Sequence, residues 1–178
     1  MANVDPSRLV FLDETGAKTN MTRLYARARK GERAVAYAPH GHWHTTTLVA
    51  GLTIAGPVAP MVLDGAMDRL SFEAYVAQCL VPELPPKAIV VMDNLGAHKS
   101  AAIAKLIEDA GATFWYLPPY SPDYNPIEQM WSKVKATLKR LCARTQEALW
   151  KAIAVALDAV SPDDCQGFFR HCSVGVKS

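Results

Sequence analysis

The sequence predicts an α/β protein in which one mixed β-sheet has helices on both faces. Two observations support this fold class. Short, largely apolar runs follow one another directly in the first part of the chain, whereas later runs alternate with segments whose apolar residues recur at helical spacing. No stretch resembles a linker between two cores, and 178 residues suit one domain. We therefore expect a single domain over residues 1–178.

The first part of the chain is predicted to form strands. Residues 9–15 (LVFLDET) are an apolar run typical of a buried strand, and residues 34–38 (AVAYA) are a candidate short strand that ends before Pro39. Residues 44–56 and 56–65 are β-rich and meet at a Gly-Pro pair, which predicts a hairpin.

Helices and strands alternate from residue 71 onward. Ser71 is a candidate N-cap for a helix over 71–84, whose end Pro82 is expected to disturb. Residues 87–94 (KAIVVMDN) are a second apolar run that ends in an acid, and they predict another buried strand. The remaining sequence predicts a helix capped by Ser100 and closed by Gly111, a strand over 112–118, two helices over 126–141 and 145–160, the second capped by Thr145, and a short helix over 161–172.

The composition is that of an ordinary globular protein, with half of the residues hydrophobic and a fifth charged. No apolar run is long enough to cross a bilayer, and the N-terminus lacks the basic and apolar regions of a signal peptide. The four cysteines form no CxxC pair and have no zinc-finger spacing, so we expect reduced thiols. These features predict a cytoplasmic protein without membrane contact.

Positive charge is concentrated in two segments, although the net charge is only +2. Residues 17–33, which lack a clean period and predict a loop or irregular hairpin, hold six basic side chains and one acidic side chain. Residues 125–151 hold six basic and two acidic side chains, so the rest of the chain is acidic. Two basic segments on an acidic body predict a polyanionic partner, with solvated surface faces as the alternative.

Two acids end the buried strands. Asp13 closes the run 9–13, and Asp93 closes the run 89–93. If these strands are parallel neighbours, the two acids lie close together, because neighbouring strands are about 4.8 Å apart, and their carboxylates could flank one cation. The alternative for either aspartate alone is that it caps a turn. Glu14 points to the opposite face of a continuing strand, so Asp13 is the candidate ligand.

A third acid, Glu128, lies in the first turn of the helix predicted over 126–141. Pro126 pre-sets φ for that turn and Asn125 is a candidate N-cap, so the helix must begin here. The proline-rich loop therefore sets the direction in which Glu128 points, although a glutamate in a first turn also suits the helix dipole.

The same helix has an apolar stripe and a basic ridge. Lys135 and Lys139 share a face with Glu128, so the acid lies at one end of a ridge that could follow a phosphate backbone. Trp131 is predicted to be a core residue rather than a base-stacking one. It belongs to the apolar stripe, which consists of Ile127, Met130, Trp131, Val134, Leu138 and Leu141.

Three carboxylates in one place need a positive counter-charge, because like charges raise each other's pKa. Mg²⁺ takes oxygen ligands and keeps several waters. Two such ions about 4 Å apart can activate a water or a 3′-hydroxyl on one side of a phosphodiester and stabilise the leaving oxygen on the other. The acids thus predict metal-dependent phosphodiester chemistry.

Four stretches together carry a family resemblance: LVFLDET, HGHWHTTTLVAGL, VVMDNLGAHKS and LPPYSPDYNPIEQMWSKVK. They resemble the catalytic core of DDE transposases, in the bacterial insertion-sequence branch related to the mariner superfamily, over about residues 8–172. The spacing of 34 residues between Asp93 and Glu128 agrees with that branch.

The resemblance implies an RNase H-like α/β fold with a mixed five-stranded sheet and helices on both faces. It implies a catalytic and metal-binding triad of Asp13, Asp93 and Glu128 that holds two Mg²⁺ or Mn²⁺ ions. Asp13 and Asp93 would hold the first ion, and Glu128 would complete the second site. The implied activity is DNA cleavage at transposon ends, followed by strand transfer into target DNA, in a cytoplasmic and nucleoid-associated protein.

Other residues are expected to support this chemistry. Asn94 and His98 are candidates for positioning a phosphate or a water beside the acids, with helix capping as the alternative. Contacts with the DNA backbone are expected from Arg27, Arg29, Lys30, Lys135 and Lys139. The helix-turn-helix region of the family is absent from the sequence, so a separate helix-turn-helix subunit or reading frame is a candidate partner, together with a second copy in a homodimer.

Some alternatives remain open from the sequence. A structure-specific nuclease of the same fold, or a catalytically silent DNA-binding or assembly subunit, would share the fold. His40, His42 and His44 alternate as in a zinc site, with a turn as the alternative. Asp123 is expected to be a turn residue.

Overall fold

The computed structural model describes residues 4–23, 25–35, 37, 45–93, 101–118 and 121–174. Within these residues, five strands form one mixed sheet in the order β3-β2-β1-β4-β5. The strands are β1 (Leu9–Ala17), β2 (Thr46–Thr53), β3 (Gly56–Asp64), β4 (Ile89–Met92) and β5 (Thr113–Tyr116). A 3₁₀ turn, η1 (Pro6–Arg8), leads into β1.

The helices follow the predicted alternation. They are α1 (Arg69–Tyr75), a π-helical turn η2 (Val76–Leu80), α2 (Val81–Glu83), α3 (Ala101–Asp109), a 3₁₀ turn η4 (Pro122–Tyr124), α4 (Pro126–Leu141), α5 (Gln146–Asp158) and α6 (Pro162–His171). The bounds of α4 are those expected from its sequence, and Thr145 caps α5 by accepting a hydrogen bond from the backbone N–H of Ala148.

The central strand β1 has neighbours of both orientations. It pairs antiparallel with β2 and parallel with β4, while β4 pairs parallel with β5. The last pair between β1 and β4 is Leu12 with Met92. The two acid-bearing strands are thus parallel neighbours, which is the condition under which the sequence places Asp13 and Asp93 close together.

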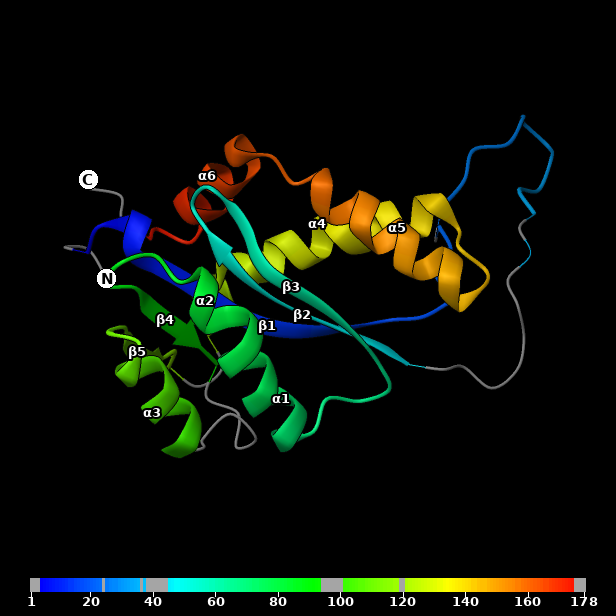
Figure 1. Ribbon diagram of the computed structural model, residues 1–178. Helices are drawn as coiled ribbons and strands as arrows, with labels where there is room; N and C mark the ends of the chain where they lie inside the picture. The colour runs from blue at the N-terminus through cyan, green and yellow to red at the C-terminus, as the bar shows by residue number, and fades with distance from the viewer. Residues whose placement is uncertain are drawn as a thin grey trace.

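Helices cover both faces of the sheet, as predicted (Figure 1). On one face, here called the α4 face, Leu9 and Phe11 of β1 pack with the buried residues of α4, α5 and α6. On the other, here called the α3 face, Val10 and Leu12 pack with α1, η2 and α3. This alternation along β1 decides on which face each acid of the strand lies.

The first helix differs from its expected course. Its N-cap is Asp68 rather than Ser71: Asp68 Oδ1 accepts the backbone N–H of Ser71 at 2.7 Å. The disturbance expected from Pro82 is confirmed: the helix widens into η2, where the N–H of Val81 donates to the carbonyl of Val76, before its last turn, Val81–Glu83. Because Pro82 has no N–H to donate, the backbone near it departs from regular α-helical bonding instead of ending the helix.

Two expectations about strands are corrected. The hairpin turn lies at Ile54 and Ala55, not at the Gly-Pro pair, because Thr53 Oγ1 accepts the backbone N–H groups of Ala55 and Gly56. Among residues 34–38, the three that the structure describes, 34, 35 and 37, are exposed and not in a strand. Residues with high β-propensity favour a strand because they fit a packed sheet surface, and these three exposed residues are not packed against one.

Candidate active site

Asp13 lies at the point where β1 and β4 separate. It is the residue directly after the last β1–β4 pair, and Asp93 is its counterpart directly after β4. The sequence predicted that Asp13 would end its strand. This is wrong, because β1 stays paired with β2 as far as Ala17. The two acids therefore lie just beyond the paired part of the parallel strands β1 and β4, at the sheet edge where functional groups of α/β proteins gather.

The alternation of β1 places Asp13 and Glu14 on opposite faces. Asp13 is on the α4 face, in phase with Phe11, whereas Glu14 is on the α3 face, in phase with Leu12. The predicted difference between these two acids is confirmed. Glu14 Oε2 is buried without a hydrogen-bond partner.

Helix α4 reaches Asp13 through a tryptophan. Trp131 Nε1 donates a hydrogen bond to Asp13 Oδ2 at 3.1 Å, and the Trp131 side chain is only 2% exposed. Trp131 is a core residue, as predicted, but its bond to the acid was not predicted from the sequence. A buried indole N–H normally needs a hydrogen-bond acceptor. The prediction that Trp131 is buried was therefore the one sign in the sequence that such a bond exists.

Glu128 is exposed in the first turn of α4. The buried side chains of Pro126 and Ile127 anchor this turn in the core. Asn125 is the N-cap residue, as predicted, although its side chain makes no capping bond. Proline geometry and burial, rather than a capping side chain, direct Glu128 away from the core.

Electrostatic repulsion shows that the three acids share one region. The pKa of Asp13 is raised to about 7: burial is the largest cause, and the charges of Glu128 and Asp93 act in the same direction. The backbone N–H of Glu14 and the indole N–H of Trp131 oppose this rise. Asp13 thus senses both other acids, although 115 residues separate it from Glu128.

The described residues contain no group of three His, Cys, Asp or Glu side chains already close enough to hold a metal ion. The three acids are therefore neighbours that do not yet converge on one point. The remaining candidates, Asn94, His98 and the histidines at 40, 42 and 44, lie outside the described residues.

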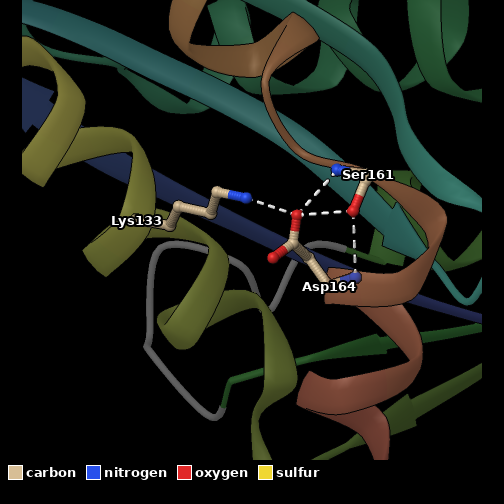
Figure 2. Close-up of polar contacts among 3 residues, drawn as sticks. All are labelled: Lys133, Ser161 and Asp164. Atoms are coloured by element: carbon tan, nitrogen blue, oxygen red, sulfur yellow. Dashed lines mark hydrogen bonds and ion pairs between the residues drawn. The ribbon is translucent and has the colours of Figure 1, made fainter.

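The last helix braces α4 from the side. Lys133 of α4 forms an ion pair with Asp164 of α6, and the same carboxylate accepts the backbone N–H and the hydroxyl of Ser161 (Figure 2). The bond from Lys133 and then those from Ser161 lower the pKa of Asp164 to about 2. In the core beneath, the rings of Phe11 and Phe169 meet edge to face at 5.5 Å. Helix α6 therefore contacts β1 and α4, the elements that carry Asp13 and Glu128.

The basic residues form two groups. Arg27, Arg29 and Lys30 are exposed in the segment between β1 and β2, residues 18–37, here called the basic arm. Lys135 and Lys139 are half-buried on α4. Ser132, which lies between them and Glu128 on this face, donates its hydroxyl to the carbonyl of Glu128 at 3.0 Å. Figure 1 shows the blue arm extending beyond the end of the α4–α5 pair, far along α4 from its first turn.

Two other predictions can be compared with the described chain. Asp123 lies exposed in the η4 turn, as expected. Across the described residues, no helix combines the length and apolar character needed to span a bilayer.

Comparison with known proteins identifies the family and the fold. The family model described as "DDE superfamily endonuclease" matches residues 8–150. The transposase of the transposable element Tcb1 from Caenorhabditis briggsae is 29% identical over an alignment of 116 residues, which covers 59% of this chain and 42% of the relative.

Solved structures share the fold. A Mos1 transposase paired-end complex with the left transposon end has a TM-score of 0.73 at 17% identity, over 94% of this chain and 52% of that chain. A mariner Mos1 paired-end complex with Mg has a TM-score of 0.68 at 18% identity, over 93% and 51%. The likeness confirms the predicted RNase H-like α/β fold, and this chain spans about half the length of these relatives. The chain belongs to the DDE superfamily endonuclease family.

Proposed function

We propose that the chain is the catalytic domain of a DNA transposase, which cleaves phosphodiesters at transposon ends and transfers the strand into target DNA. The observation that carries the proposal is the placement of the acids: Asp13 and Asp93 come directly after the last pair of the adjacent parallel strands β1 and β4, and Trp131 bonds Asp13 to the helix that carries Glu128. Family membership and the transposase relatives support the same activity.

The acids are suited to divalent metal ions by the chemistry of their oxygen donors. Mg²⁺ and Mn²⁺ prefer carboxylate oxygen, and a cation would relieve the repulsion that Asp13 experiences. We assign Asp13 and Asp93 to one ion and Glu128 to a second. When bound, such ions activate the attacking oxygen and stabilise the leaving one. A small approach of Glu128 toward the strand ends would complete the ligand set, since the acids do not converge in the described chain.

The protein itself contributes position and charge. Trp131 bonds Oδ2 of Asp13 and thereby fixes the orientation of this carboxyl beside the strand ends. The rigid start of α4 presents Glu128 at the surface, where a DNA strand can approach. Lys135 and Lys139 extend from Glu128 along one side of α4 and contact the phosphate backbone without reading sequence.

Recognition of transposon ends is assigned to a partner. We propose that a helix-turn-helix subunit supplies sequence specificity and that two copies of the catalytic domain act on the two ends of one element. This chain by itself should then bind end DNA and scrambled DNA with the same affinity. A clear preference for end DNA in a gel-shift titration would contradict the division of labour.

Two rival functions make different predictions. A structure-specific nuclease would hydrolyse phosphodiesters without joining a 3′-hydroxyl end to a second DNA. A silent assembly subunit would bind DNA without metal-dependent cleavage. An assay that follows a labelled pre-cleaved end with a free 3′-hydroxyl separates all three: a transposase forms a joined product, a nuclease gives only shortened DNA, and a silent subunit leaves the DNA unchanged.

The residues are tested by isosteric substitutions. Asp93→Asn and Glu128→Gln should each abolish Mn²⁺-dependent nicking and joining while DNA binding persists, because each removes one ligand charge from the surface. Asp123→Asn is the matched control, since it neutralises an exposed acid only five residues from Glu128. Nicking at the wild-type rate by either triad variant removes that residue from the proposed site.

A further inference from the structure

One arginine joins the two ends of the basic arm to the helical layer. Arg144 Nη1 donates to the backbone carbonyls of Thr19 at 2.9 Å and Met21 at 3.1 Å, and its Nη2 donates to the carbonyl of Tyr37 at 3.3 Å. Thr19 and Met21 lie where the arm leaves β1, and Tyr37 lies where it returns toward β2. A single guanidinium therefore holds both ends of the arm.

The local backbone fixes the place of this arginine. Helix α4 ends at Cys142, which has a left-handed φ of 52° and donates its N–H to the carbonyl of Leu138 at 3.0 Å. Helix α5 begins after Thr145, whose hydroxyl caps it. Only three residues, 142–144, separate α4 from the cap of α5. The Arg144 side chain therefore projects from a short connection whose two ends are both constrained.

The chemistry of the contact requires an arginine. A guanidinium is planar, permanently charged and presents five N–H donors in a rigid fork, so it can serve three carbonyls at once. A lysine ammonium is a single point on a flexible stem and would lose this geometry. The half-buried position of Arg144 makes the bonds stronger than they would be in open water.

The described residues in the middle of the arm, 25–35, lie away from the body of the protein. Residues 25–35 are all exposed, and the side chains of Tyr25 and Tyr37 are 90% and 88% exposed. A local turn, in which the N–H of Glu32 donates to the carbonyl of Arg29 at 2.9 Å, shapes the middle of the arm but does not attach it to the body. The direction of the arm is therefore set at its base.

Charge indicates which ligand this arrangement suits. The arm carries six basic side chains and one acidic side chain, and the adjoining last turn of α4 carries Lys139 and Arg140. Holding so many like charges together costs free energy unless a polyanion neutralises them. Helix α4 is about 24 Å long at 1.5 Å per residue, the length of roughly seven base pairs of DNA, so one duplex can contact Lys135, Lys139 and the arm together.

We propose that Arg144 is a positioning residue that latches the basic arm to the end of α4, so that the arm and the ridge of Lys135 and Lys139 form one continuous contact surface for the DNA phosphate backbone. The identity of the ligand rests on the proposed function, whereas the latch itself does not.

The test compares three variants of the full chain on a duplex of about 20 base pairs, long enough for both parts of the surface. Arg144→Ala removes the latch, and Arg144→Lys keeps the charge but removes the fork. Arg140→Ala, at an exposed position four residues earlier, removes one positive charge without touching the latch. Thermal melts establish that each variant is folded, and Arg144→Lys serves alone if Arg144→Ala does not fold.

Two measurements are made on each variant. Trypsin cleavage within the arm should become roughly tenfold faster in both Arg144 variants, because the arm opens more often. The slope of log K against log salt for DNA binding should fall by about two or more in both, whereas the single positive charge removed in Arg140→Ala accounts for at most about 0.9.

The outcomes are distinct. If Arg144→Lys behaves like the wild type, or if Arg144→Ala changes the slope no more than Arg140→Ala does, the latch proposal is wrong. If trypsin cleavage accelerates in the Arg144 variants but the wild-type chain shows no salt-dependent DNA binding, the latch is supported and the DNA ligand of the proposed function is overturned.

Discussion

Trp131 Nε1 lies 3.1 Å from Asp13 Oδ2, and this hydrogen bond connects the central strand to the helix that carries Glu128. Trp131 follows Glu128 by three residues, which is about one helical turn. A single helix therefore supplies one acid of the proposed site and the donor that orients another. The distance between Asp13 and Glu128 depends on how firmly α4 is seated on β1.

Removing the indole N–H should weaken the site more than it weakens the fold. Trp131→Phe keeps an aromatic ring but leaves Asp13 Oδ2 without its donor. We expect a loss of about 2–3 kcal/mol in the free energy of unfolding, from the charged hydrogen bond and the smaller ring together. Metal-dependent nicking should fall at least tenfold beyond the fraction of protein that is unfolded, since Asp13 is no longer oriented.

Trp150→Phe is the matched control. Trp150 lies on α5, and its side chain is 42% exposed, so the same substitution there touches no acid. Denaturant unfolding and a nicking assay at saturating Mn²⁺ are made on both variants. Equal nicking by the two variants, at equal folded fraction, would show that the Trp131 bond serves packing alone.

The raised pKa of Asp13 makes the stability of the metal-free protein depend on pH. An unfolded aspartate loses its proton near 3.8, whereas Asp13 in the folded chain keeps it until about pH 7. Between these values the folded state binds more protons than the unfolded state. The contribution of Asp13 therefore lowers the free energy of unfolding as pH rises from about 4 to 7, by up to about 4 kcal/mol.

Asp13→Asn removes this dependence. In chelator, the melting temperature of the variant relative to the wild type should rise between pH 4.5 and 7.5.

Adding Mn²⁺ should stabilise the wild type, by about 2.7 kcal/mol at a hundredfold excess over Kd, and increasingly so toward pH 7.5 as the carboxyl loses its proton. Asp93→Asn should be at least as stable as the wild type without metal and should gain less from Mn²⁺. Equal gains in all three proteins would place the ion elsewhere.

The basic ridge on α4 can be tested independently of the arm. Lys135→Ala with Lys139→Ala should lower the salt slope of DNA binding by about 1.8, near 0.9 for each phosphate that is no longer neutralised, with no dependence on DNA sequence. Lys105→Ala with Lys151→Ala is the control pair, because these exposed lysines are already paired with Asp109 and Glu147 within their own helices. A slope that the ridge variant leaves unchanged would mean that this face is merely solvated.

The contact between Lys133 and Asp164 should stabilise the fold modestly. Asp164→Ala removes the ion pair to α4 and the capping box with Ser161, and we expect a loss of about 1–2 kcal/mol. Because the pKa of Asp164 is lowered to about 2, its contribution is fully present above pH 4 and is lost as pH falls toward 2.

A double-mutant cycle separates the two parts of this contact. Lys133→Met removes only the ion pair and Ser161→Ala only the cap, so a cycle of each with Asp164→Ala assigns the free energy. We expect less than about 1 kcal/mol from the partly exposed ion pair. Additive losses from Lys133→Met and Asp164→Ala would show that the ion pair contributes nothing.

Local sequence was sufficient to predict the order of the elements and the faces of the acids. Alternation along β1 separated Asp13 from Glu14, and an apolar run ending in Asp93 identified the parallel partner strand. The start of α4 followed from Pro126, because the residue before a proline is excluded from helical conformation. Each of these features depends on groups a few residues apart, which one chain segment displays by itself.

Long-range packing decided the rest. Asp13 lies within β1 rather than at its end because β2 continues to pair with the strand after β4 has stopped. Trp131 bonds to Asp13, 118 residues away, and Arg144 bonds to Thr19, 125 residues away. No local sequence pattern shows whether a tryptophan or an arginine will meet a distant hydrogen-bond acceptor. Hydrogen bonds of this kind form only once the layers have packed. Packing brings the donor and the acceptor together, and it removes the water that would otherwise bond to each of them.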